Sequence, residues 1–245
     1  MHRRFAMLLV ASLGGLLVLT GCSDLSAQLS GEQSSEPVNE AAAPPPPLVT
    51  ESWGTVDGLL SVLVRNPSRR TLRYAAATVT ARDASGVSVA SSRGEAEPRD
   101  CCVVTDLPPG ATFGLYVDVG TDVESVQDVE VAFRDVAWRA PSPTKPPPME
   151  ATAIRLAAGA SGAVVLADVA TPGGAVDEAV LQAHLVDAHG EFLAVVSGRW
   201  ACFAAGGSRR IEMQLFHPVP PGTEVASVLA YPVLSPARPA PGCTG

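Results

Sequence analysis

The stretch Tyr74-Ala75-Ala76-Ala77-Thr78-Val79-Thr80-Ala81-Arg82, followed by Asp83-Ala84-Ser85-Gly86, carries the signal that decides the fold. From Ala77 onward, apolar and polar side chains alternate, which is typical of a strand with one buried face. Asp, Ser and Gly then break the alternation because these residues favour turns. The stretch therefore predicts a half-buried strand that ends at Arg82.

Further strand signals lie on both sides of this stretch. An apolar run, Leu59 to Val64, precedes a turn at Asn66-Pro67-Ser68, and alternating apolar residues follow at 113–119 and 129–133. Breaks rich in Gly, Pro, Asp and Ser separate these runs, and no amphipathic helical stretch lies between them. Several short strands at such spacing predict a β-sandwich.

The second half of the chain repeats the first. Thr80–Gly86 aligns with His184–Gly190, and Gly58–Leu63 aligns with Gly162–Ala167, both at a separation of 104 residues. Later, Ala132-Phe133 aligns with Ala230-Tyr231 at a separation of 98 residues. We therefore expect six extra residues (104 − 98) in the first copy, in the loop from Ser91 to Asp100.

These patterns predict an all-β protein with two tandem immunoglobulin-like β-sandwich modules, after a signal peptide and a disordered stalk. The expected modules span residues 50–140 and 150–236. A stiff proline-rich linker, 141–149, joins them, and a short tail, 237–245, follows. Each module is long enough for one modest hydrophobic core.

The N-terminal residues carry a targeting signal. Arg3 and Arg4 precede an apolar run, Phe5 to Leu19, which ends in Leu19-Thr20-Gly21-Cys22. Such a run is shorter than the ~20 residues that span a bilayer, and its order of charge, apolar run and small residues is that of an export signal. An ordinary secretory signal with an incidental cysteine is the alternative.

The stretch ending at Cys22 resembles the lipobox signal of bacterial lipoproteins. This resemblance implies that the signal peptide, residues 1–21, is removed and that the sulfur of Cys22 receives a diacylglyceryl group with chains such as palmitate. It implies a cell-membrane protein, lipid-anchored on the extracytoplasmic face. Two acyl chains anchor stably where one is marginal. Residues 22–49, rich in Pro, Ser and Glu, cannot bury enough apolar surface to fold and are expected to form a disordered stalk.

The charge of the chain excludes one class of partner. It has 25 acidic and 17 basic residues, and removal of the signal peptide would take away Arg3 and Arg4. Nucleic-acid binding depends on neutralising phosphates, so we expect no nucleic-acid partner. The excess of negative charge also argues against electrostatic docking on anionic lipid, which leaves the anchor on Cys22 as the expected membrane contact.

Both predicted modules resemble the FxLYD-type β-sandwich modules of bacterial lipoproteins. The matching segments are Val79-Thr80-Ala81-Arg82-Asp83 and Ala183-His184-Leu185-Val186-Asp187, and a Pro-Gly turn follows at Leu107-Pro108-Pro109-Gly110. The aspartates and Leu185 match the motif, but both aromatic positions are lost. The resemblance implies a non-catalytic module that binds or spaces, with no known ligand and no cofactor.

Asp83 and Asp187 each precede a glycine by three residues. This spacing predicts an Asx-type turn in which Gly86 and Gly190 adopt positive φ. A calcium site would need more oxygen ligands than either turn offers, so we expect none.

Four cysteines remain besides Cys22, namely Cys101, Cys102, Cys202 and Cys243. Outside the cytoplasm an even number predicts disulfides. Pairing within modules forces the vicinal bridge Cys101–Cys102, which requires a distorted peptide because neighbouring strand residues face opposite sides. The other two connectivities join the modules, and our hypothesis is that at least one bridge crosses between them.

No pattern of residues predicts catalysis. Gly206-Gly207-Ser208 lacks the frame of a nucleophile elbow, and Met213 alternates with core residues rather than joining His217 as a metal ligand. His184 aligns with Thr80 and is expected to face outward. The tryptophans are expected as core or strand-edge residues rather than sugar platforms: Trp53, Trp138 and Trp200.

We therefore expect a non-enzymatic binding or assembly module that contacts an envelope protein or a cell-wall component. The alternative is a carrier that delivers a metal, lipid or sugar at the membrane surface.

Overall fold

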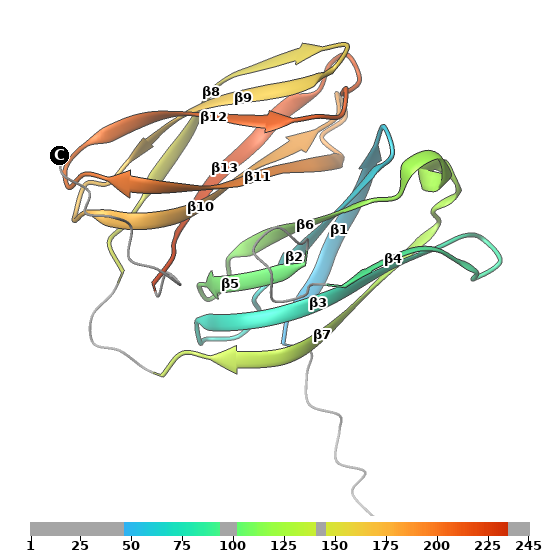
Figure 1. Ribbon diagram of the computed structural model, residues 1–245, viewed down its shortest axis with the longest axis horizontal. Helices are drawn as coiled ribbons and strands as arrows, with labels where there is room; N and C mark the ends of the chain where they lie inside the picture. The colour runs from blue at the N-terminus through green and yellow to red at the C-terminus, as the bar shows by residue number, and fades with distance from the viewer. Residues whose placement is uncertain (1–46, 94–101, 141–145, 235–245) are drawn as a thin grey trace, which may run out of the picture. The chain divides into compact units, whose positions relative to one another are not determined.

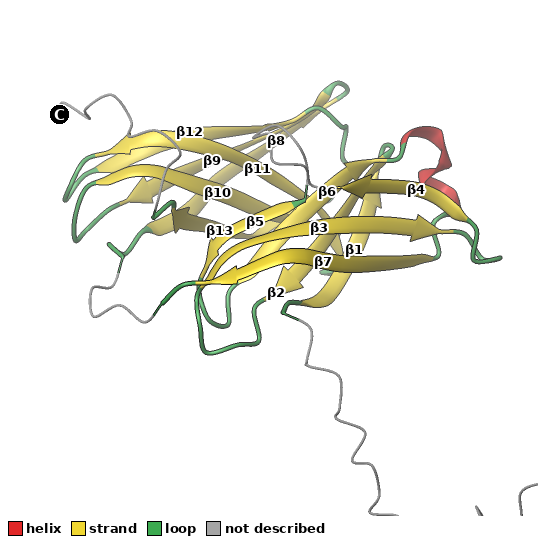
Figure 2. Cartoon of the chain, turned by 60° about the horizontal axis from the view of Figure 1, so that its bottom comes forward, coloured by secondary structure: helices red, strands yellow, loops and turns green. Residues whose placement is uncertain are grey.

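The computed structural model describes residues 47–93, 102–140 and 146–234. Within them the chain forms thirteen strands and one short 3-10 helix, η1 (Gly120–Ser125), and all strand pairs are antiparallel (Figures 1 and 2). The all-β sandwich prediction is confirmed. The described residues all belong to one compact unit that begins at Pro45, and the count of two modules stays a prediction. The expected signal peptide, stalk and most of the linker lie outside the described residues.

The first half of the fold contains two sheets. One has the order β1-β2-β6, with β1 (Val49–Val56), β2 (Leu59–Arg65) and β6 (Thr112–Asp118). The other is built around β3 (Leu72–Arg82), which pairs on one side with β7 and on the other with β4 and then β5. The bounds of these partners are β4 (Ser88–Arg93), β5 (Val103–Leu107) and β7 (Asp128–Trp138).

The second half repeats this arrangement with fewer strands. One sheet has the order β12-β9-β8, and the other has the order β11-β10-β13. The central strand β10 (Val176–Val186) lies 104 residues after β3 at both ends. The remaining strands are β8 (Glu150–Gly159), β9 (Gly162–Ala170), β11 (Phe192–Phe203), β12 (Ser208–Leu215) and β13 (Glu224–Pro232). The single strand β11 takes the place of β4 and β5, so the extra residues of the first half fall between those two strands.

Two of the sequence alignments are wrong by one residue. The core side chains of β2 are those of Leu60, Val62 and Val64, whereas the core side chains of β9 are those of Val165, Ala167 and Val169. Their separation is 105 residues rather than 104, and a slip of one residue moves every side chain of a strand to its other face. The loop that follows β9 is accordingly one residue shorter than the loop that follows β2.

The second error concerns the last strand of each half. Phe133 pairs with Ala77, and the residue 104 positions after Ala77 is Leu181, which pairs with Ala230. Phe133 therefore corresponds to Ala230 at a separation of 97 residues, and not to Tyr231 at 98. Tyr231 instead packs in the core of the first half.

The sheets β1-β2-β6 and β11-β10-β13 are buried on both faces. Consecutive residues of β2, Leu60, Ser61 and Val62, have no exposed surface, and the same is true of Leu181, Gln182 and Ala183 in β10. One face of each sheet packs on its own core, and the other faces meet through contacts of β11 with β1, β2 and β6. The four sheets therefore form a continuous stack, and runs of buried residues replace the expected alternation in the two inner sheets.

Two glycines allow this close approach of sheets. A Cβ on Gly54 of β1 would lie 2.3 Å from the carbonyl oxygen of Phe192 and 2.8 Å from the Cα of Leu193 in β11. A Cβ on Gly114 of β6 would lie 2.5 Å from a methyl carbon of Val195. At Gly54 the neighbouring backbone, and at Gly114 the side chain of Val195, lies closer than a Cβ would permit.

We predict that Gly54→Ala destabilises the fold by about 1–3 kcal/mol, because overpacking forces the two strands apart. The matched control is Gly159→Ala, where the nearest atom to the new Cβ is 3.8 Å away. Urea denaturation of both variants measures the difference. Equal stability of the two variants would contradict the close packing of β1 on β11.

Candidate functional site

A buried polar layer lies where the two inner sheets meet. The side-chain Oε1 of Gln182 accepts a hydrogen bond from the Gly114 N–H at 2.7 Å, and its Nε2 donates to the Gly114 carbonyl at 2.9 Å. The same Nε2 donates to the Ser197 hydroxyl at 3.2 Å. Gly114 lies on an edge strand, whose backbone groups need partners when buried. The carboxamide of Gln182 supplies both partners, as a further strand would.

Ser61 makes the reciprocal contact. Its hydroxyl accepts a hydrogen bond from the Val195 N–H at 3.2 Å, on the edge strand β11. Each inner sheet therefore contributes one polar side chain that satisfies an edge of the other. These groups are fully used in holding the sheets together, and this layer is a structural contact.

His184 is buried in the same region and does not face solvent as expected. It is 6% exposed, because the face of β10 that matches the outer face of β3 is covered here by a second sheet. Its Nδ1 lies 3.2 Å from the Ser227 hydroxyl, its ring meets Phe192 edge-on, and its Nε2 has no partner among the described residues. Burial lowers the pKa of His184 to about 4, and the negative charge of Glu51 opposes this shift.

A buried ion pair ties the last strands of the two halves together. The carboxylate of Asp106 in β5 pairs with the Arg139 guanidinium at 2.5 Å through Oδ1 and accepts the Leu234 N–H at 2.9 Å through Oδ2. The hydroxyl of Tyr231 donates to the Thr112 carbonyl nearby. These contacts join the ends of β5, β7 and β13. Both carboxylate oxygens of Asp106 therefore have structural partners.

Asn66 and Thr171 hold equivalent turns in the two halves. The side-chain amide of Asn66 donates to the carbonyls of Arg70, Leu107 and Pro108 at 2.9–3.1 Å. Thr171 donates from its hydroxyl to the Ala204 carbonyl at 2.5 Å. Both residues also exchange backbone hydrogen bonds with the turn that precedes β6 or β12. The equivalence supports the separation of 105 residues found for β2 and β9.

The Asx turns predicted at Asp83 and Asp187 are present. Oδ1 of Asp83 accepts the N–H groups of Ser85 and Val87, and Oδ1 of Asp187 accepts those of His189 and Glu191. The third residue after each aspartate is a glycine with φ of 81° or 85°. The Ser85 hydroxyl lowers the pKa of Asp83, and the Glu191 N–H lowers the pKa of Asp187. Each carboxylate is thus used to close a turn.

The cysteines are only partly described. Cys102 and Cys202 are disulfide-bonded, and both adopt positive φ. Cys101, Cys243 and the predicted lipidation site Cys22 lie outside the described residues. The connectivity, including the hypothesis of a bridge between modules, stays a prediction.

The other sequence candidates are dispersed. Met213 is in the second core as expected, and Nδ1 of His217 lies 2.8 Å from the Asp57 carbonyl. The three tryptophans pack against the two cores. Within the part of the chain that the structure describes, no group of three or more His, Cys, Asp or Glu could hold a metal ion. No helix among those residues is long and apolar enough to cross a membrane.

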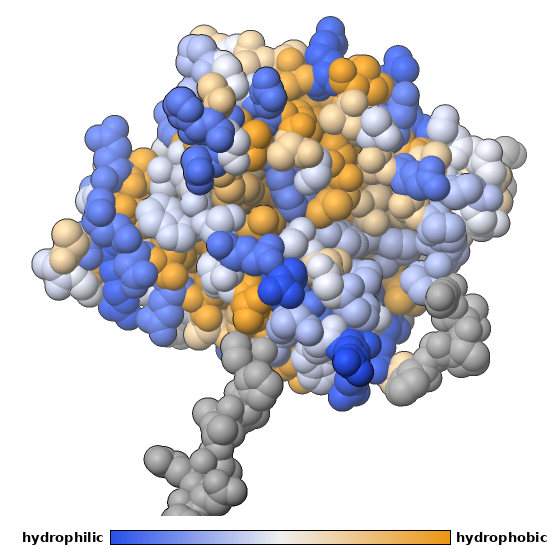
Figure 3. All heavy atoms as spheres, turned by 180° about the vertical axis from the view of Figure 1, so that it is seen from behind, coloured by the Kyte–Doolittle hydropathy of each residue, from blue (hydrophilic) through white to orange (hydrophobic). Residues whose placement is uncertain are grey.

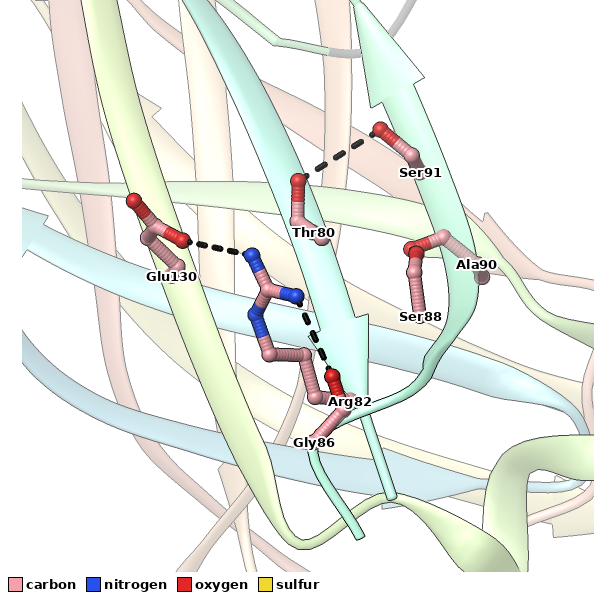
Figure 4. Close-up of polar contacts among 7 residues, drawn as sticks. All are labelled: Thr80, Arg82, Gly86, Ser88, Ala90, Ser91 and Glu130. Carbon is pink, nitrogen blue, oxygen red and sulfur yellow. Dashed lines mark hydrogen bonds and ion pairs between the residues drawn. The ribbon is translucent and has the colours of Figure 1, made fainter. Parts of the chain in front are cut away.

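The outer face of the sheet around β3 is polar. Figure 4 shows Thr80 beside Ser91, with their hydroxyls 3.4 Å apart, and Arg82 between Glu130 and the Gly86 carbonyl. Hydroxyl groups and an exposed ion pair of this kind are well solvated, and nothing in their arrangement demands a partner.

The outer face of the sheet β12-β9-β8 carries charged residues, such as the ion pair Arg210–Asp168, and a few apolar side chains among them. Val164 and Leu166 of β9 alternate with core residues and point outward, where Val164 pairs with Ala157. Phe216, just beyond β12, is 73% exposed, and Ile154 in the bulge of β8 is 45% exposed. Figure 3 shows apolar residues interspersed with hydrophilic ones over one face of the molecule. We call the group Ile154, Ala157, Val164, Leu166 and Phe216 the apolar strip.

The repeat explains why the apolar strip exists. At the separation of 105 residues, Val164 and Leu166 correspond to Leu59 and Ser61 of β2. In the first half, this face is covered by the sheet β11-β10-β13. In the second half, no described element covers the corresponding face. The sequence did not predict this strip, because a single sequence does not show which sheet is left uncovered.

No family model matches the chain, and no curated protein is similar enough to count as a relative.

We predict that His184 makes the fold less stable in acid. Because its pKa falls from 6.5 to about 4 on folding, the unfolded chain binds a proton that the folded chain does not bind at intermediate pH. The contribution of His184 to the free energy of unfolding is fully present above pH 6.5 and is lost as the pH falls toward 4. The total loss is on the order of 3 kcal/mol.

Unfolding by urea across this pH range tests the prediction. His184→Asn removes the titrating group, so its free energy of unfolding should depend less on pH than that of the native chain. His189→Asn changes an exposed histidine in a turn and serves as the control. The same pH dependence in the native chain and in His184→Asn would show that burial of this ring has no such effect.

Proposed function

We propose that this protein is a non-enzymatic, lipid-anchored binding module on the extracytoplasmic face of the cell membrane. In this proposal, Cys22 carries the anchor and the folded part contacts an envelope protein or a cell-wall component. The observation that carries it is the apolar strip, a sheet face whose counterpart in the same chain packs on another sheet.

Burial of the apolar strip against a partner would be favourable in free energy. Burial of apolar surface contributes roughly 25 cal/mol per Å², and a large exposed residue such as Phe216 contributes most when a partner covers it. Polar and charged residues flank the strip on the neighbouring strands, with Arg155 and Glu212 beside Leu166 and Gln214 beside Val164. An apolar centre with a polar rim is the usual composition of a protein–protein interface.

The polar and titratable side chains of the fold support a binding role over a catalytic one. The carboxylates of Asp83, Asp106 and Asp187 close turns or pair with arginine, and the carboxamide of Gln182 caps a strand edge. Groups engaged in this way stabilise turns and strand edges, and they lie on different elements of the fold.

Cross-linking in intact cells tests the proposal. We expect one defined partner to be linked to the native protein and identified by mass spectrometry. Cys22→Ser should lose the partner because the chain leaves the membrane, and the double variant Ile154→Ser with Phe216→Ser should lose it because the strip loses its apolar area.

The control is Val87→Ser, which removes a 60% exposed apolar residue in the turn after β3, away from the strip. It should retain the partner. Retention by all variants would show that the strip is not the interface. A small molecule, metal or glycan bound to the purified chain, with no protein or cell-wall partner, would favour a carrier instead.

A further inference from the structure

Three exposed arginines lie close together at one end of the first half of the fold. Arg69 and Arg70 are in the loop between β2 and β3, and Arg73 follows at the start of β3. Asn66 fastens this loop to the turn before β6, and the Arg139 N–H donates to the Thr71 carbonyl. These hydrogen bonds fix the conformation of the loop relative to the sheet. We call Arg69, Arg70 and Arg73 the basic end.

The charges of the basic end are not neutralised by neighbours. Six described arginines form ion pairs with carboxylates: Arg65, Arg82, Arg134, Arg139, Arg199 and Arg210. Arg69, Arg70 and Arg73 form none with the described residues, and the guanidinium of Arg70 lies 5.7 Å above the ring of Trp138. Glu51 in β1 and Asp106 in β5 are already paired with Arg65 and Arg139.

The opposite end of the same sheets is acidic. The turn after β1 holds Asp57, β6 ends at Asp118, η1 carries Asp122 and Glu124, and β7 begins at Asp128. The length of β2, seven residues, separates the two ends by about 23 Å at ~3.3 Å per residue. This distance exceeds the ~8 Å Debye length at physiological salt. A charged surface near one end therefore interacts only weakly with the charges at the other end.

The chain enters the fold at the basic end. Val49, the first residue of β1, pairs with Arg65, the last residue of β2, and the loop with Arg69 and Arg70 follows directly. In Figure 2 the start of β1 and the loop after β2 lie together on the lower side. Whatever precedes Val49 is therefore attached beside the basic end, and an anchor on Cys22 would hold this end nearest to the membrane.

We propose that the basic end docks on anionic phospholipid head groups and that the acidic end points away from the membrane. The proposal rests on the proposed function in one respect, because the anchor on Cys22 would be what keeps the basic end beside the membrane in the cell. The net charge of the whole chain, −8, predicts repulsion from such a membrane. The separation of charge between the basic end and the acidic end predicts instead that the fold is oriented with its basic end toward the membrane. Trp138, which lies beside Arg70, suits a contact with the membrane–water interface, where tryptophan is enriched.

Vesicle binding of the unlipidated chain from residue 22 onward, with Cys22→Ser, tests the docking itself. The probes are vesicles of phosphatidylcholine alone and vesicles of phosphatidylcholine with an equal share of phosphatidylglycerol. We expect binding only to the second kind, and we expect it to weaken at high salt. Each arginine near an anionic surface contributes about fivefold, so Arg69→Gln, Arg70→Gln and Arg73→Gln together should weaken binding about a hundredfold.

The matched control is the triple variant Arg199→Gln, Arg209→Gln and Arg210→Gln, which changes the net charge equally but lies on β11 and β12. It should keep the binding, and circular dichroism should show both variants folded. Equal loss in the two variants, or equal binding to both kinds of vesicle, would overturn the proposal.

The outcome is separable from that of the proposed function. The vesicle assay needs no anchor, whereas the mass of the N-terminal peptide from cells reports lipidation of Cys22 directly. Vesicle binding without lipidation would contradict the anchor alone, and lipidation without vesicle binding would contradict the docking alone.

Discussion

The carboxamide of Gln182 on the backbone of Gly114 is the contact on which the arrangement of the four sheets depends. It satisfies the N–H and the carbonyl of a buried edge strand at once. Leaving such groups buried without partners costs about 1–3 kcal/mol each, a large share of the stability of a typical domain. The absence of a Cβ at Gly114 lets Val195 fill the adjacent space. Polar capping and close packing therefore reinforce each other at one point.

This contact joins the two repeats into one unit. Two copies of one strand pattern would suggest two independent sandwiches joined by a linker. Instead, one sheet of the first half packs on one sheet of the second half, and Val180 and Tyr231 of the second half belong to the core of the first. The duplication leaves two outer faces of different character, one polar and one that carries the apolar strip among charged residues. The polar face is stable in water, and the apolar strip is the surface that gains most from a partner.

The sequence was most informative where one face of a strand is buried. The positions of β3 and β10, the Asx turns at Asp83 and Asp187, and the core role of Met213 all follow from local alternation and turn chemistry. It was least informative where a sheet is covered on both faces. His184 looked like a surface residue because its counterpart Thr80 is one, and the alignment of β2 with β9 slipped by one residue because both faces of β2 are apolar. Contacts between distant strands decide these cases, and a single sequence does not contain them.

Differential scanning calorimetry of the unlipidated chain from residue 22 onward, with its disulfides intact and Cys22→Ser, tests the central claim most directly. If the inner sheets bind the two halves into one unit, unfolding is a single transition whose calorimetric and van't Hoff enthalpies agree. Two resolved transitions, one for each half, would show that the halves are independent sandwiches and that the contact between Gln182 and Gly114 does not unite them.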